Sequence, residues 1–154
     1  MRAEQIVLSI KKILLASDLG ANSQRATEYA RMFTSQFGAE LHVLHVLEDV
    51  LVNTPSFGGG LALNSYVHES KSVVEGKIHS QFEPAWLLGK QLIAATAEGD
   101  PADQILRYAK EHAIDLIILG THGRTGLSHI LVGSVAEQVT RKSKCAVVVV
   151  RSRS

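Results

Sequence analysis

The amino-acid sequence predicts an α/β fold, an open parallel sheet of five strands with helices on both of its faces. Short apolar runs alternate along the chain with segments of helical periodicity, which is the order of βα units. These apolar runs are nearly continuous, as strands that are covered on both faces require. Neither an internal repeat nor a linker interrupts the 154 residues, so we expect one domain over residues 1–154.

The first strand is predicted over residues 11–17 (KKILLAS), a short apolar run. A loop follows, and Asn22 or Ser23 can cap the next helix. Gly38 is the expected end of that helix, because glycine readily adopts the left-handed conformation found there. One apolar stripe marks the inner face of the helix, formed by Ala26, Tyr29, Ala30, Phe33 and Phe37. The second strand is predicted over residues 41–47 (LHVLHVL).

The middle of the chain is predicted as a loop, a helix and a strand. Residues 48–63 contain Pro55 and three consecutive glycines, so they indicate a loop. Residues 64–82 look helical, although Gly76 lowers the helical propensity, and Pro84 is expected to end the helix. The third strand is predicted over residues 90–97 (KQLIAATA).

The second half contains the clearest helix start. Asp100 is the expected N-cap, Pro101 the first helical residue, and Asp103 lies near the positive helix end. The inner stripe of this helix is Ala102, Ile105, Leu106 and Ala109. The fourth strand is predicted over residues 115–119 and the fifth over residues 145–150. A last helix lies between them, with Val135, Ala136 and Val139 directed inward.

The composition excludes several classes of protein. Sixteen Lys and Arg nearly cancel fifteen Asp and Glu, so the net charge of +1 argues against a nucleic-acid binder. With one cysteine, Cys145, no intrachain disulfide can form. The N-terminus lacks the apolar run of a signal peptide, and no stretch reaches the roughly 18 apolar residues of a membrane span. We therefore expect a cytoplasmic protein that does not bind membranes.

A glycine-rich stretch, GTHGRTGLSHILVGS, follows the fourth strand from Gly120 to Ser134. Its spacing matches neither the dinucleotide-binding G-x-G-x-x-G pattern nor the Gly-Lys-Ser/Thr of a P-loop. Glycine nevertheless lets backbone N–H groups approach an anion, and the following helix start supplies further N–H groups and a favourable dipole. Arg124 could add a positive charge. The stretch therefore predicts a phosphate site.

The predicted order of elements places an acidic residue beside this stretch. Asp18 comes just after the first strand and Gly120 just after the fourth. In a 3-2-1-4-5 sheet these strands are neighbours at the point where the strand order reverses, which is where such sheets bind ligands. We expect both residues to flank one crevice.

The sequence also resembles a known family. Gly120-x-x-Gly123, followed after nine residues by Gly133-Ser134, resembles the G-x2-G-x9-G-S/T motif of the nucleotide-binding universal stress proteins. The segments KKILLASDLG, LHVLHVLED, GDPADQIL and GRTGLSHILVGSVAEQV resemble the family in the same order. The resemblance covers residues 11–151, nearly the whole chain.

This resemblance implies a Rossmann-like sheet of the adenine nucleotide alpha-hydrolase type with strand order 3-2-1-4-5, an adenine-nucleotide pocket that holds ATP, and a homodimer. A magnesium ion could arrive with ATP and need few protein ligands. Asp18 and the Val46 backbone would face the adenine, and Gly120 would pass near the ribose. Gly123, Gly133, Ser134 and Val135 would hold phosphates. The full set of expected binding residues is Ala16, Ser17, Asp18, Val46, Leu119, Gly120, His122, Gly123, Arg124, Gly133, Ser134 and Val135.

The sequence leaves the activity open among three alternatives. The first is a nucleotide-dependent signalling module, the second a slow ATPase or adenylate-acting enzyme, and the third a dimeric interaction protein with a vestigial pocket. No catalytic set is evident, and His42 and His45 lie three apart on a strand, so they point to opposite faces and cannot share a metal. The apolar edge strand of residues 145–151 is the expected dimer contact.

Overall fold

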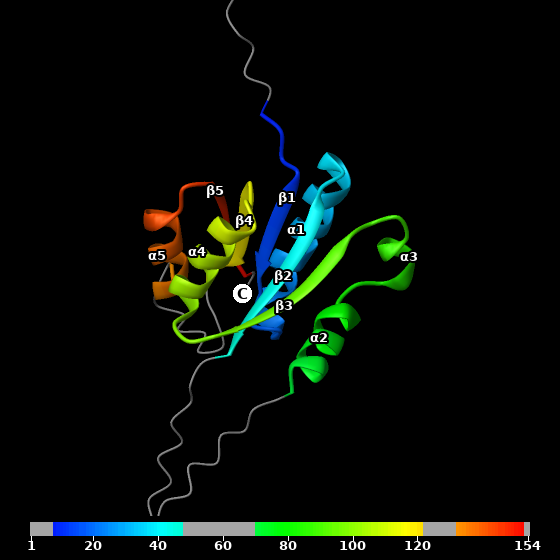
Figure 1. The fold of residues 1–154 in the computed structure, drawn as a ribbon, viewed down its shortest axis with the longest axis horizontal. Helices are drawn as coiled ribbons and strands as arrows, with labels where there is room; N and C mark the ends of the chain where they lie inside the picture. The colour runs from blue at the N-terminus through cyan, green and yellow to red at the C-terminus, as the bar shows by residue number, and fades with distance from the viewer. Residues whose placement is uncertain (1–7, 48–69, 122–131, 153–154) are drawn as a thin grey trace, which may run out of the picture.

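A computed structural model of the chain describes residues 8–47, 70–121 and 132–152. Five parallel strands form one sheet in the order β3-β2-β1-β4-β5. Their bounds are β1 Lys12–Ala16, β2 Glu40–Leu47, β3 Leu92–Glu98, β4 Leu116–Gly120 and β5 Ala146–Val150. The strand arrows all run toward the same edge of the sheet (Figure 1). The predicted fold class and strand order are therefore confirmed.

Helices cover both faces of the sheet. After a short 3-10 turn at Ala21–Ser23 come α1 Gln24–Phe37, α2 Lys71–Ser80, α3 Pro84–Leu87, α4 Pro101–Glu111 and α5 Ser134–Lys142. In Figure 1, α1 lies behind the sheet, and α4 and α5 lie on the opposite side from α2 and α3. Within the described ranges, none of these helices is long and apolar enough to cross a lipid bilayer.

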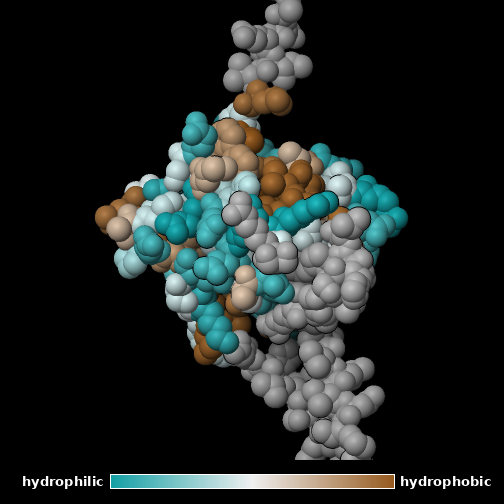
Figure 2. Space-filling view, turned by 180° about the vertical axis from the view of Figure 1, so that it is seen from behind, coloured by the Kyte–Doolittle hydropathy of each residue, from teal (hydrophilic) through white to brown (hydrophobic). Residues whose placement is uncertain are grey.

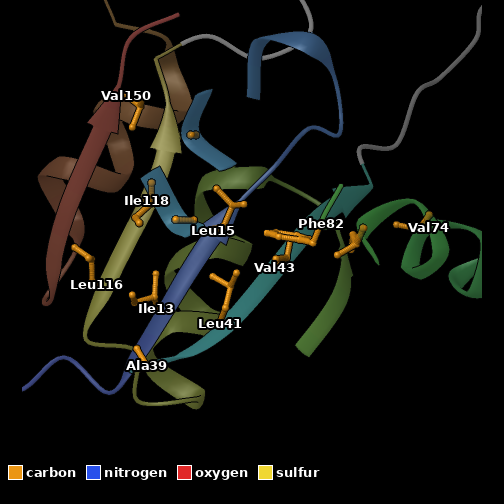
Figure 3. Close-up of a cluster of buried hydrophobic side chains, with 13 residues drawn as sticks. Ile13, Leu15, Ala39, Leu41, Val43, Val74, Phe82, Leu116, Ile118 and Val150 are labelled. Carbon is orange, nitrogen blue, oxygen red and sulfur yellow. The ribbon is translucent and has the colours of Figure 1, made fainter. Parts of the chain in front are cut away.

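Alternate residues of each strand fill two separate cores. Ile13 and Leu15 of β1 pack with Leu41 and Val43 of β2 toward α1 and α2, as Figure 3 shows. Leu14 and Leu44 point to the other face, against Ala102, Ile105, Ala136 and Val139 of α4 and α5. The continuous apolar runs of the sequence reflect this burial on both faces.

Two helix ends follow the local signals of the sequence. Gly38 follows α1 in the left-handed region, with φ 61° and ψ 33°. The Asp100 side chain accepts a hydrogen bond of 3.0 Å from the Asp103 backbone N–H, which caps α4 as predicted.

Other helix ends differ in detail from the local signals. The helix expected to end before Pro84 does so, since α2 ends at Ser80, and Pro84 itself begins α3, because the fixed φ of proline also suits the first helical turn. Ser23, one of the two expected caps, is the N-cap residue of α1, but its hydroxyl donates to the Gly20 carbonyl and does not cap the helix. Phe37, expected on the inner stripe, is 45% exposed at the end of α1, where it stacks on Phe33.

Candidate functional site

The carboxyl ends of β1 and β4 meet at the point where the strand order reverses. Ala16 of β1 pairs with Leu119 of β4 on one side and with Leu44 of β2 on the other. The chain after β1 and the chain after β4 therefore leave the sheet side by side. In open parallel sheets this reversal opens the crevice in which ligands bind. Of the expected residues, Ala16, Leu119 and Gly120 lie on this edge.

The turn after β1 fixes the position of Asp18. Asp18 Oδ1 accepts a hydrogen bond of 2.9 Å from the Gly20 N–H, and the Ser17 hydroxyl accepts one of 3.1 Å from the Leu19 N–H. Leu19 has a φ of 59°, a left-handed conformation that is costly for leucine and is held by these contacts. Residues 17–20 therefore form a preorganised turn beside the end of β1.

Glycine at position 20 gives the Asp18 carboxylate its space. A Cβ atom on Gly20 would lie 3.3 Å from Asp18 Oδ1, closer than ordinary van der Waals contact. The backbone of Gly20, at φ −96° and ψ 176°, would itself accept any residue. Glycine is therefore favoured at position 20 because of the space that the Asp18 carboxylate needs, and not because of the backbone conformation.

The start of α5 is tied to the end of β4. Thr121 donates its backbone N–H to the Val150 carbonyl at 2.9 Å, and the Gly133 N–H donates to the Thr121 carbonyl at 2.6 Å. Gly133 is the N-cap of α5 and Ser134 is its first helical residue, so Ser134 does not cap the helix. The contact at Thr121 holds the α5 N-terminus at the same edge of the sheet as Asp18.

This contact changes the expected role of Gly133. Its N–H is already used by Thr121, whereas the N–H groups of the first helical turn have no intrahelical acceptor. Those of Ser134, Val135 and Ala136 are therefore the ones that α5 can offer to an anion, supported by the helix dipole.

Val46 reaches the same edge from β2. Leu44 accepts the Ser17 N–H at 3.0 Å, which is the last backbone bond between β1 and β2 among the described residues. Strand alternation directs the N–H and C=O of Val46 to the same side as those of Leu44, beyond the end of β1. The other expected residues, His122, Gly123 and Arg124, lie outside the described residues.

Sequence reasoning missed a buried polar group behind the Asp18 turn. Ser17, Ser23, Thr27 and His45 are all at most 5% exposed. The Ser17 and Ser23 hydroxyls are 3.1 Å apart, Thr27 bonds the Ser23 carbonyl, and His45 Nδ1 lies 2.9 Å from the Ser17 carbonyl oxygen. The available signal was a polar residue within an otherwise apolar strand, but its partner depends on strand register.

A second polar group lies on the opposite face of the sheet, between β2 and α4. His42 Nε2 is 2.7 Å from Glu40 Oε1, and His42 Nδ1 is 2.8 Å from the Tyr108 hydroxyl. Burial lowers the pKa of His42 from its usual value, against the opposing effect of Glu40. Burial likewise raises the pKa of Tyr108. His42 and His45 thus face opposite sides, as predicted.

The described ranges hold no cluster of three or more His, Cys, Asp or Glu side chains arranged as metal ligands. At the carboxyl edge of β1 and β4 the Asp18 carboxylate is an acceptor, and the first N–H groups of α5 are donors. Such a set of groups suits hydrogen bonding to a polar organic ligand and its phosphates.

Comparison with known proteins agrees with this architecture. The sequence model of the universal stress protein family matches residues 9–151. A universal stress protein of Methanocaldococcus jannaschii is 32% identical over 142 residues, which cover 92% of this chain and 82% of that protein. The structure of the universal stress protein UspA from Lactobacillus plantarum superposes with a TM-score of 0.74 at 25% identity, over 94% of this chain and 99% of that one.

Two further solved structures contain nucleotides. One is a universal stress protein in complex with cAMP, with a TM-score of 0.67 and 19% identity over 94% of this chain and 98% of that one. The other is a universal stress protein from Archaeoglobus fulgidus in complex with dAMP, with a TM-score of 0.58 and 20% identity over 92% and 98%. These two share the fold with this chain. The family match over nearly the whole sequence, together with the relative at 32% identity, shows that the chain belongs to the universal stress protein family.

Proposed function

We propose that this protein binds an adenine nucleotide, and ATP in particular, at the carboxyl edge of β1 and β4. One observation carries the proposal: the Asp18 turn and the α5 N-terminus are both anchored at the sheet reversal, by Ser17–Leu44 and by Gly133–Thr121. An acceptor for the exocyclic amine of adenine and donors for phosphate thus border one crevice.

Each end of the nucleotide would meet different chemistry. The Asp18 carboxylate would accept a hydrogen bond from the adenine amine, and the Val46 backbone would bond the edge of the base. Gly120 would leave space for the ribose at the end of β4. The N–H groups of Ser134 and Val135 and the Ser134 hydroxyl would contact phosphate oxygens. Gly133 would contribute space, since its N–H bonds Thr121. Magnesium would be bound mainly by the phosphates, as this ion commonly is.

The relatives favour an adenine compound over other ligands. The solved structures with cAMP and dAMP both hold an adenine nucleotide within this fold. The glycine motif of this chain, together with Ser134, suits a longer phosphate chain than either compound carries. We therefore propose a nucleotide-dependent stress-response module, in which the presence of ATP changes what the protein binds.

The test compares ATP binding by the wild type with that of variants at each end. Asp18→Asn leaves one oxygen for the Gly20 N–H and turns the other carboxylate oxygen into an NH2 donor, which would repel the adenine amine. Gly133→Val fills the space beside the α5 N-terminus. Both variants should lose ATP affinity while retaining the melting temperature of the wild type. Wild-type affinity in both variants would refute the assignment of this crevice. An assay of released phosphate on the same samples would reveal slow hydrolysis.

We further propose that two copies pair along β5, which lies at the end of the sheet. Because Val150 accepts from Thr121 on the β4 side, strand alternation turns the N–H and C=O groups of Val147 and Val149 outward. Hydrophobic residues also gather on the side of the molecule seen in Figure 2, where α1 and β5 lie, and Met32 is 53% exposed. An outward row of backbone groups beside apolar surface favours pairing with a second copy.

A further inference from the structure

His45 is buried behind the proposed adenine end of the crevice, so its side chain would not itself contact the nucleotide. It is 4% exposed and belongs to β2, whereas Ser17 and Asp18 follow β1. Its Nδ1 is 2.9 Å from the Ser17 carbonyl oxygen. A carbonyl oxygen only accepts, so Nδ1 carries the proton and donates it.

The imidazole of His45 takes the place of a backbone hydrogen bond that would otherwise continue the ladder between β1 and β2. In a parallel ladder the next rung after Ser17 N–H to Leu44 C=O would run from the Val46 N–H to the Ser17 carbonyl. The ladder is described as far as the Ser17–Leu44 bond, and the Ser17 carbonyl instead accepts from His45. The two strands can therefore separate at this point without leaving the Ser17 carbonyl buried and unpaired.

Ser17 also anchors the rest of the turn. The Ser17 hydroxyl bonds both the Leu19 N–H and the Ser23 hydroxyl, and Leu19 is held in the left-handed region. Movement of the Ser17 peptide would displace Asp18 and its bond to Gly20. The bond from His45 therefore affects the positions of both Asp18 and Val46, the two residues proposed to contact the adenine.

We propose that His45 is a positioning residue for adenine recognition: its Nδ1–H bond to the Ser17 carbonyl replaces a ladder bond, holds Asp18 in place and leaves the Val46 backbone facing the ligand. This inference rests on the proposed nucleotide site. It assigns His45 to the base end of the nucleotide and not to the phosphate end, which α5 would bind.

The test uses three variants and two ligands. His45→Leu removes the donor, His45→Asn keeps an N–H donor at the Nδ1 position, and His45→Gln moves the donor to the Nε2 position. Adenosine probes the base end and inorganic tripolyphosphate probes the phosphate end. We expect His45→Leu and His45→Gln to weaken adenosine binding about tenfold, the value of one lost hydrogen bond, and to leave tripolyphosphate binding unchanged. His45→Asn should restore most of the adenosine affinity.

Each outcome decides the proposal. Wild-type adenosine affinity in His45→Leu, or an equal loss for adenosine and tripolyphosphate, overturns the positioning role. If His45→Leu does not fold, equal adenosine affinities for His45→Asn and His45→Gln overturn it. A wild type that binds neither adenosine nor ATP refutes the proposed function and with it this inference, whereas a binding wild type with unaffected variants refutes the inference alone.

A second readout needs no ligand. Nitrogen-15 NMR of the imidazole at neutral pH distinguishes the two neutral tautomers. We expect His45 to carry its proton on Nδ1, as the bond to the Ser17 carbonyl requires. A ring protonated on Nε2 alone would overturn the inference.

Discussion

Replacing Tyr108 by phenylalanine should destabilise the protein, because it removes a hydroxyl that a buried histidine needs. His42 is 1% exposed, and its Nε2 lies 2.7 Å from the Glu40 carboxylate, which only accepts. Nε2 therefore carries the proton, and the bare Nδ1 accepts the Tyr108 hydroxyl at 2.8 Å. The phenylalanine would keep the ring that stacks 3.8 Å from His112 and lose only this bond.

The size of the effect follows from the burial of His42. A buried acceptor left without its donor costs about 1–3 kcal/mol. For a chain of this length, that loss lowers the melting temperature by about 2–12 °C. Differential scanning calorimetry at pH 7.5 measures it, with Tyr29→Phe on α1 as the control that removes the same atom on the other face of the sheet. Equal melting temperatures for Tyr108→Phe and the wild type would refute the reasoning.

The same group predicts an acid sensitivity with a definite sign. Because burial lowers the pKa of folded His42 below its unfolded value near 6.5, the unfolded chain takes up a proton first as the pH falls. The free energy of unfolding should therefore decrease from about pH 6.5 downward, and this loss ends below the folded pKa. Of the groups that face His42, Glu40 opposes the effect of burial and raises the pKa, whereas His112 and Lys12 lower it further; Tyr108 bonds the Nδ1 atom. Urea unfolding should be measured as a function of pH for the wild type and for His42→Gln, whose side chain does not titrate. The free energy of unfolding should fall more steeply with decreasing pH in the wild type. Parallel pH dependences in the two proteins would refute the assignment to His42.

Three further results are expected. Asp100→Ala should lower the free energy of unfolding by about 0.5–2 kcal/mol in urea titrations, because the Asp103 N–H loses its cap, while Asp100→Asn should retain most of it; equal loss in both would contradict the capping role. Gly20→Ala should weaken adenosine binding and leave the melting temperature near that of the wild type, since the new Cβ would press on Asp18 Oδ1 from 3.3 Å; unchanged calorimetric affinity would show that Asp18 is not a base contact. Val149→Pro should convert a dimer to monomers in analytical ultracentrifugation because it removes an outward N–H, whereas Val149→Ala should remain dimeric; a monomeric wild type at micromolar concentration would contradict pairing along β5.

The sheet could be predicted from the sequence because each strand is a continuous apolar run between clear helix signals. The runs that became β1 and β4 also placed Asp18 and Gly120 beside each other once the strand order was known. That order came from the family resemblance and not from the strands themselves, since apolar runs carry no information on which neighbours they choose.

Other features depend on contacts that local signals do not encode. Pro84 suits either the end or the start of a helix, so its position alone could not decide that α3 begins there. The occupied N–H of Gly133 follows from how α5 meets Thr121, and the bond from His45 to Ser17 follows from the register of β1 and β2. In each case the partner lies on another element, and only the folded chain brings it near.

The most direct test of the account is a calorimetric titration of the nucleotide-stripped protein with ATP, ADP and AMP, with and without magnesium. The account predicts binding of all three, with ATP tighter than AMP, because the α5 N-terminus reads the added phosphates while Asp18 and Val46 hold the base. The absence of both binding heat and any change in melting temperature would contradict it, and the glycine stretch would then be a turn and not a nucleotide site.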